Sequence, residues 1–143
     1  MSGSSPLLAR HIRVVVADAT RMNCQLIAGA LKRGRNNFDV HALTGNSRVA
    51  FLELQNVRPD VAVISAQLED GRFTGFKVLH QLCTSQSKTP AVMLLDSAER
   101  DLIVEAFRAG ARGVFCRRDS IKALPKCIRR VHEGQIWVNN AEL

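Results

Sequence analysis

The sequence lacks cysteine and histidine residues at the spacing that a metal site or a disulfide scaffold requires. Its four cysteines, Cys24, Cys83, Cys116 and Cys127, are far apart, they form no CxxC pair, and no histidine stands at metal-ligand spacing. This pattern argues against structural zinc and against a disulfide framework. We therefore expect reduced thiols that are mostly buried, with Cys83, Cys116 and Cys127 as core residues rather than redox sensors.

Long hydrophobic runs are also missing. The first six residues are polar apart from Met1 and Pro6, the pair Leu7-Leu8 is too short for a signal core, and no later run approaches the length of a membrane span. We expect a cytoplasmic protein without membrane contact, in which residues 1–10 form a disordered extension. No internal repeat or low-complexity tract is present.

Acidic residues are in the minority, since 20 Lys and Arg face 13 Asp and Glu, which gives a formal charge of +7. Such a charge can favour nucleic acid, an acidic partner or anionic lipid, and it does not choose among them. The basic residues are dispersed and no segment is left over for a helix-turn-helix, so direct DNA binding by this domain alone is the weakest hypothesis. A chain of 143 residues, 46% of them hydrophobic, predicts one compact domain.

Short β-rich runs alternate with segments of helical periodicity, as expected for βαβ units around a parallel sheet. Helix one is predicted from apolar residues at helical spacing, with Asp18 or Thr20 as its cap. Asp96, Ser97 or Asp101 can cap the fourth helix in the same way. The five predicted strands are 12–17, 38–43, 61–64, 91–95 and 114–116, and the apolar positions of helix one are Met22, Leu26, Ile27, Ala30 and Leu31.

Four segments, in order and at the right spacing, resemble the receiver domains of bacterial response regulators. They are 12–18 (IRVVVAD), 59–64 (PDVAVI), 89–94 (TPAVML) and 106–113 (AFRAGARG). The last of these is most similar to receivers attached to LuxR-type helix-turn-helix domains. The resemblance implies an α/β, flavodoxin-like parallel sheet of five strands in the order 2-1-3-4-5 with helices on both faces. It implies a receiver-like domain over residues 11–133, followed by the start of a linker or tail at 134–143.

The residues that such receivers use for phosphorylation are largely replaced. The family places an acidic pair after strand one to hold Mg²⁺, an aspartate at the end of strand three to accept the phosphoryl group, and a hydroxyl residue and a lysine at the ends of strands four and five. By this resemblance the corresponding positions are Asp18, Ala19, Ser65, Leu95 and Arg117. A degenerate site that lacks the acceptor carboxylate is therefore predicted.

Each remaining polar residue of this site has two interpretations. Asp18 is either a weak metal ligand or, as we favour, a helix cap, because Mg²⁺ prefers more than one carboxylate or phosphate. Arg117 either pairs with Asp18 or Asp70, imitating a neutralised site, or lies exposed in solvent. Asp70, in a loop longer than usual, is a possible substitute acid. Ser65 is a poor phosphoacceptor because the sequence identifies no neighbouring base.

The leading functional hypothesis is a phosphorylation-independent receiver that acts as a regulatory or protein-interaction module of a LuxR-type transcription regulator, without enzymatic activity, cofactor or Mg²⁺. Two alternatives stay open: a phosphoacceptor that uses Asp70 or Ser65, and a small-ligand sensor at the former phosphorylation site. Expected partners are a second copy, another signalling protein, and DNA only through a downstream helix-turn-helix.

For the second copy, we expect contact through helix four, strand five and helix five, or through helices one and five. Such a surface needs an apolar centre in addition to its charges, and Ile103 or Ile121 is the candidate. The charged residues expected at this interface are Arg108, Arg117, Arg118 and Lys122.

Overall fold

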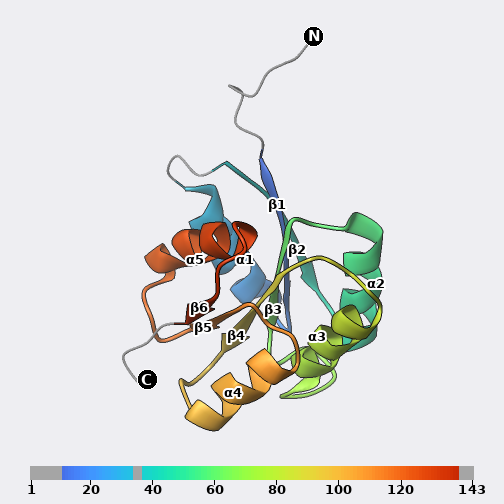
Figure 1. The fold of residues 1–143 in the computed structure, drawn as a ribbon. Coiled ribbons are helices and arrows are strands. Elements are labelled where there is room, and N and C mark those ends of the chain that lie inside the picture. Colours follow the sequence, from blue (N-terminus) through green and yellow to red (C-terminus); the bar gives the residue numbers. More distant parts are fainter. Residues whose placement is uncertain (1–10, 34–36, 139–143) are drawn as a thin grey trace.

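A computed structural model describes residues 11–33 and 37–138, which form one parallel sheet with helices on both of its faces (Figure 1). The strand order is β2-β1-β3-β4-β5-β6. The strands are β1 (Ile12–Asp18), β2 (Phe38–Thr44), β3 (Val61–Ser65), β4 (Ala91–Leu95), β5 (Gly113–Cys116) and β6 (Trp137–Val138). The helices are α1 (Arg21–Lys32), α2 (Ser47–Val57), α3 (Thr74–Thr84), α4 (Arg100–Arg108), the 3-10 turn η1 (Ile121–Ala123) and α5 (Leu124–His132). The predicted extension at 1–10 lies outside the described residues.

The core has two halves, one on each face of the sheet. The central strands β3 and β4 are buried at every position, as expected for apolar runs covered on both faces. Helices α1 and α5 cover one face, while α2, α3 and α4 cover the other (Figure 1). The parallel α/β sheet predicted from the alternating pattern is confirmed, as is the flavodoxin-like strand order that the family resemblance implied, and the carboxyl ends of all strands lie at one edge.

Helix α1 buries only part of the apolar stripe predicted for it. Thr20 is the N-cap and accepts a hydrogen bond from Asn23 N, so one of the two predicted caps is correct. Ile27 and Leu31 are buried against the sheet, whereas Met22 and Leu26 are 71% and 62% exposed. Two large apolar side chains of α1 therefore face away from the core.

The sheet has six strands, so the prediction of five strands was wrong by one. Residues Trp137 and Val138 form β6, which pairs in parallel with β5 through Gly113 and Val114. The prediction that the chain leaves the domain at residue 134 missed this pairing, because two residues are too few to give a periodic signal. Without β6, the outer edge of β5 would present unpaired backbone groups. Trp137 also packs against the core beneath α5.

The cysteines differ from the prediction at one position. Cys24, Cys116 and Cys127 are buried, while Cys83 is exposed. Burial raises the pKa of the Cys127 thiol to about 12 and also raises the pKa of Cys24. Cys83 lies near the end of α3, where it is no core residue.

Candidate functional site

Three polar side chains meet at the carboxyl edge of the sheet. Asp18 is the last residue of β1, Ser65 is the last residue of β3, and Arg117 directly follows β5. In a parallel sheet these strand ends lie together, where ligands of such folds usually bind. Asp18 and Ser65 are only 1% and 0% exposed. The fold thus places a carboxylate, a hydroxyl and a guanidinium in a closed cluster, hereafter the Asp18 cluster.

Every oxygen of the Asp18 carboxylate is occupied. Oδ2 accepts hydrogen bonds from Ser65 Oγ and Arg117 Nη2, and Arg117 Nη2 also donates to Ser65 Oγ at 2.5 Å. Oδ1 accepts from Thr20 N at 3.1 Å and from Asn23 Nδ2 at 3.2 Å. Asp18 therefore binds residues at the start of α1 through Oδ1 and forms the ion pair with Arg117 through Oδ2.

Arg117 links this buried pair to the surface. Its side chain is 27% exposed, and its Nε lies 3.0 Å from Asp96 Oδ1 in the turn after β4. Of the two interpretations of Arg117, the structure has the ion pair, with Asp18 and not with Asp70 as its partner. Asp96 was predicted only as a helix cap, but α4 begins after Glu99 without a side-chain cap. No sequence signal marked Asp96 as the second anion.

Asp70 is held elsewhere. Its two carboxylate oxygens accept hydrogen bonds from Ser47 N at 2.9 Å and Ser47 Oγ at 2.6 Å, at the first residue of α2. The Ser47 hydroxyl is the main cause that lowers the pKa of Asp70. Asp70 therefore stabilises the start of α2 through Ser47, the residue that follows the N-cap Asn46. The structure does not bring Asp70 into the Asp18 cluster.

Leu95 and Ala19, the two apolar residues predicted to belong to this site, offer no side-chain oxygen as a ligand. Leu95, the last residue of β4, is 1% exposed and packs in the core on the side of α2, α3 and α4. Ala19 is half-buried beside Asp18. Among the described residues, no group of three or more His, Cys, Asp or Glu side chains gathers closely enough to hold a metal ion.

The electrostatics of Asp18 follow from these contacts. Burial raises the pKa of a carboxyl group, but the hydrogen bond from Ser65 and the charge of Arg117 act in the opposite direction, and the net pKa of Asp18 is lowered. Asp18 is therefore ionised at neutral pH and is neutralised by Arg117. The cluster is an internal salt bridge at the carboxyl edge of the sheet.

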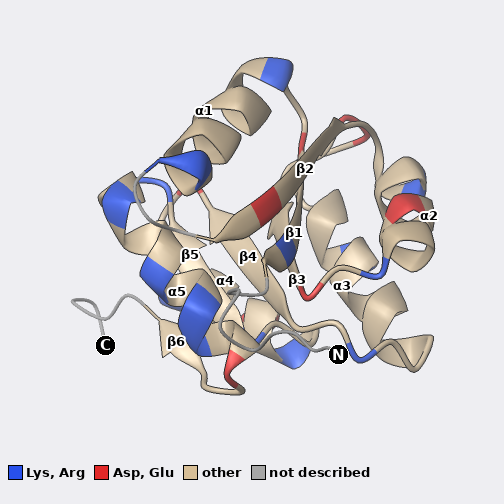
Figure 2. Ribbon diagram, turned by 90° about the horizontal axis from the view of Figure 1, so that it is seen from above, with Lys and Arg blue, Asp and Glu red and all other residues tan. Residues whose placement is uncertain are grey.

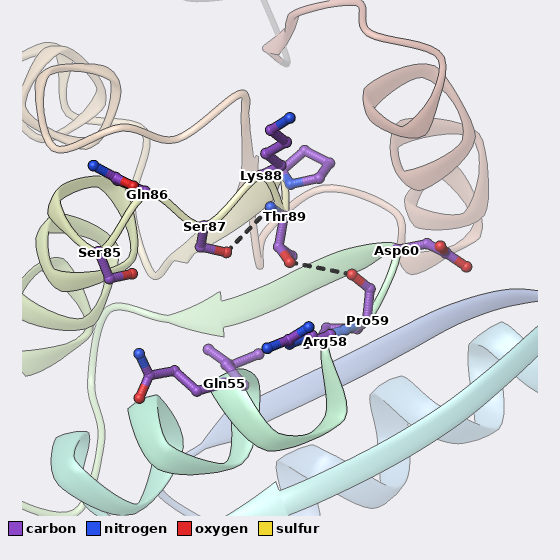
Figure 3. Close-up of a pocket in the computed structure, with 11 residues that line it drawn as sticks. Gln55, Arg58, Pro59, Asp60, Ser85, Gln86, Ser87, Lys88 and Thr89 are labelled. Atoms are coloured by element: carbon purple, nitrogen blue, oxygen red, sulfur yellow. Dashed lines mark hydrogen bonds between the residues drawn. The ribbon is translucent and has the colours of Figure 1, made fainter.

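A hollow lies at the opposite end of the sheet (Figure 3). It has a volume of about 460 Å³ and is bounded by the last turn of α2 and the segment that follows α3. Its hydroxyls serve local structure: Thr89 Oγ1 donates to Pro59 O, and Ser87 Oγ accepts from Thr89 N, both at 3.2 Å. Arg58 and Lys88 line this hollow with positive charge. The carboxyl ends of α2 and α3 also border it, and their partial negative charge makes the hollow less favourable for an anion. This hollow is a weaker candidate than the Asp18 cluster.

In the described part of the chain, no helix is both long enough and apolar enough to span a bilayer.

Comparison with known proteins agrees with the geometry of the fold. The family model "Response regulator receiver domain" matches residues 14–129. The curated protein "Transcriptional regulatory protein LnrK" of Bacillus subtilis (strain 168) is 24% identical over 123 residues, which are 86% of this chain and 54% of that protein. The chain thus spans about half the length of this relative.

Solved structures show the same fold at low sequence identity. A LuxR-family response regulator from Aurantimonas sp. SI85-9A1 superposes with a TM-score of 0.81 at 16% identity, covering 89% of both chains. The receiver domain of the response regulator NarL from Mycobacterium tuberculosis gives a TM-score of 0.76 at 20% identity, covering 88% of this chain and 99% of the other. The family match extends over most of the sequence. The chain belongs to the family of response regulator receiver domains.

Proposed function

We propose that this receiver domain regulates by a phosphorylation-independent route, as an interaction module of a LuxR-type transcription regulator. The observation that carries the proposal is the pairing of Asp18 with Arg117 and Ser65 inside the closed cluster. An arginine salt bridge fills the place where a receiver would hold Mg²⁺ and an acyl phosphate. The activity proposed is regulatory and not catalytic.

Mg²⁺ does not fit the donors of this cluster. The ion requires a near-octahedral shell of oxygens and is usually held by more than one carboxylate or phosphate. Here one carboxylate is present, its oxygens are occupied by four donors, and one of these donors is a cation. Bringing Mg²⁺ to Asp18 would require Arg117 to leave a buried anion.

The alternative phosphoacceptors have less support. Ser65 Oγ is fully buried and donates its proton to a carboxylate whose pKa is lowered, so that carboxylate is a weak base. Asp70 is bound to Ser47 and separated from the cluster. A ligand site centred on Asp18 and Ser65 also lacks support, because these side chains are 1% and 0% exposed.

We expect no stable phosphoryl adduct when the chain is incubated with acetyl phosphate and Mg²⁺, because the acceptor carboxylate and one metal ligand are replaced by Ser65 and Ala19. Intact-protein mass spectrometry measures the adduct. The matched control is the variant in which Ala19→Asp, Ser65→Asp, Leu95→Thr and Arg117→Lys restore the family's residues, and this variant should gain an adduct. A stoichiometric, hydroxylamine-labile adduct on the unmodified chain would contradict the proposal.

Self-association through α4, β5 and α5 is the second part of the proposal. The exposed surface of α4 carries both signs of charge, Asp101 and Glu105 with Arg108, so two copies related by a twofold axis can pair unlike charges. Ile103 is only 4% exposed and cannot form the apolar centre expected of it, whereas its neighbour Val104 is 40% exposed. Arg117 is engaged with Asp18, whereas the other three basic residues predicted for this interface, Arg108, Arg118 and Lys122, are exposed.

The alternative surface formed by α1 and α5 is less suited to a symmetric dimer. Helices α1 and α5 and the turn η1 contain Lys and Arg but no Asp or Glu, and Figure 2 shows basic segments along both helices with no acidic segment on either. A twofold contact there would place cations against cations. This repulsion favours the face built on α4.

We expect Arg118→Glu to weaken self-association several-fold, because it reverses one charge of the proposed interface, while Arg48→Glu on α2 leaves it unchanged. Sedimentation velocity at a series of protein concentrations measures the association. An unmodified chain that stays monomeric at all concentrations, or two variants with equal effects, would count against the α4–β5–α5 surface.

A further inference from the structure

A second cavity lies beside the Asp18 cluster and has a different character. It is enclosed between α1 and η1, with β4 and β5 as its floor, and its volume is about 310 Å³. Its walls are mainly apolar and include Leu26, Ala30, Phe115 and Ile121, while Arg33 and Arg117 contribute the cationic groups. We call this cavity the α1–η1 pocket. Its volume is at the lower end of the range of small-molecule sites.

Two large apolar side chains of the pocket wall lie outside the buried core. Leu26 is 62% exposed and Ile121 is 39% exposed, although both are large hydrophobic side chains. The adjacent residue Met22, one helical turn before Leu26, is 71% exposed. Exposed apolar side chains that cluster at a concave site mark a binding surface more often than isolated ones do.

The charged residues that line the pocket are basic, and two carboxylates, those of Asp18 and Asp96, pair with one of them, Arg117. None of the residues that line the pocket is acidic, and the three elements α1, η1 and α5 carry no Asp or Glu. Arg117 uses Nη2 for Asp18 and Ser65 and Nε for Asp96, so its Nη1 remains without a partner among the described residues. A guanidinium beside an apolar cavity is suited to a carboxylate.

We propose that the α1–η1 pocket binds a small monocarboxylic acid with an apolar aromatic or aliphatic body, the body between Leu26 and Ile121 and the carboxylate towards Arg117. The pocket is distinct from the former phosphorylation site, which is closed. Binding in the pocket does not depend on the proposal that the domain works without phosphorylation. Because Arg117 belongs to both sites, a carboxylate bound at Nη1 shares one guanidinium with Asp18, which uses Nη2, and with Asp96, which uses Nε. Occupation of the pocket is thereby coupled to the Asp18 cluster.

The test uses 2-naphthoate as the probe and 2-naphthamide as its neutral match of the same shape. Each is titrated into the isotope-labelled full chain while amide and arginine Nε–H resonances are followed by NMR. We expect saturable shifts at residues of the pocket, a shift of the Arg117 Nε–H signal with naphthoate only, and an affinity at least tenfold higher for the acid than for the amide.

Two alanines of α1 provide matched variants. Ala30→Leu fills the pocket and should abolish saturable binding, while Ala28→Leu, on the same helix but outside the pocket lining, should bind as the unmodified chain does. Equal affinities for the acid and the amide would overturn the carboxylate assignment. Binding that survives Ala30→Leu, or shifts scattered over the whole surface, would overturn the site.

Discussion

Replacing Arg117 by methionine should lower the free energy of unfolding by about 3 kcal/mol, because removal of one partner of a buried ion pair leaves the other charge uncompensated. The side chain of Asp18 is 2% exposed, so water cannot replace the lost guanidinium without opening the cluster. Methionine keeps much of the length and apolar stem of arginine, which limits the effect to the charge. Equilibrium denaturation by urea at pH 7 measures the change.

The control for Arg117→Met is the double variant that also carries Asp18→Asn. With both charges removed, the remaining amide still meets Thr20 N and Ser65 Oγ, and most of the lost stability should return. If the double variant is no more stable than Arg117→Met, the charge pair is not what holds these strand ends together.

The same pair predicts how stability depends on pH. The pKa of Asp18 in the folded chain lies below its ordinary value of 3.8, so the unfolded chain binds the proton more tightly. The contribution of the ionised carboxylate is therefore fully present above the unfolded pKa and is lost as the pH falls through the folded value. The difference in stability between the unmodified chain and Asp18→Asn should be constant near neutral pH and shrink in acid below pH 3.8.

Most of the fold could be predicted from the sequence because the strongest signals, apolar runs and a helix cap, are local. Continuous apolar runs predicted the buried strands β1, β3 and β4, and the first helix cap at Thr20 followed from residue type. The short strand β6 was missed because two residues carry no period, and its formation depends on the edge that β5 leaves open. Pairing between distant segments is a property of the assembled sheet.

The candidate site was only partly accessible for the same reason. The resemblance to receivers predicted that Asp18, Ser65 and Arg117 follow or end strands on one edge of the sheet, and the structure has all three there. Which anion Arg117 selects depends on loop conformation. Asp70 binds Ser47 and Asp96 binds Arg117, and nothing in the spacing of these residues distinguishes the two aspartates.

The burial of apolar side chains on α1 was also overestimated from periodicity. A helical stripe contains every apolar residue within a broad arc, but the sheet contacts a narrower one, so Ile27 and Leu31 are buried while Leu26 is not. The turn η1 lies beside α1, and the exposed Leu26 of α1 and Ile121 of η1 both line the α1–η1 pocket. An apparent error in the core prediction thus locates a surface feature.

Gly75→Ala should destabilise the fold by about 3 kcal/mol, although alanine is a better helix former than glycine. Gly75 is the second residue of α3 and is buried against the end of β3. An added Cβ would overlap the carbonyl oxygen of Ser65 and lie 2.9 Å from the Ser65 carbonyl carbon and 3.0 Å from Ala66 Cα. All three are backbone atoms, so no change of rotamer relieves the contact, and α3 or the end of β3 must shift.

The matched control is Gly29→Ala on α1, where the nearest atom to an added Cβ is the end of the Arg33 side chain at 3.9 Å. Here only helix propensity acts, and the variant should be more stable by about 0.5–1 kcal/mol. Urea denaturation gives both values, and amide NMR shifts at Ser65 and Asp18 should change in Gly75→Ala alone, because the displaced backbone carries Ser65 in the Asp18 cluster. Two variants that stabilise the chain equally would mean that α3 does not pack on Ser65 as described.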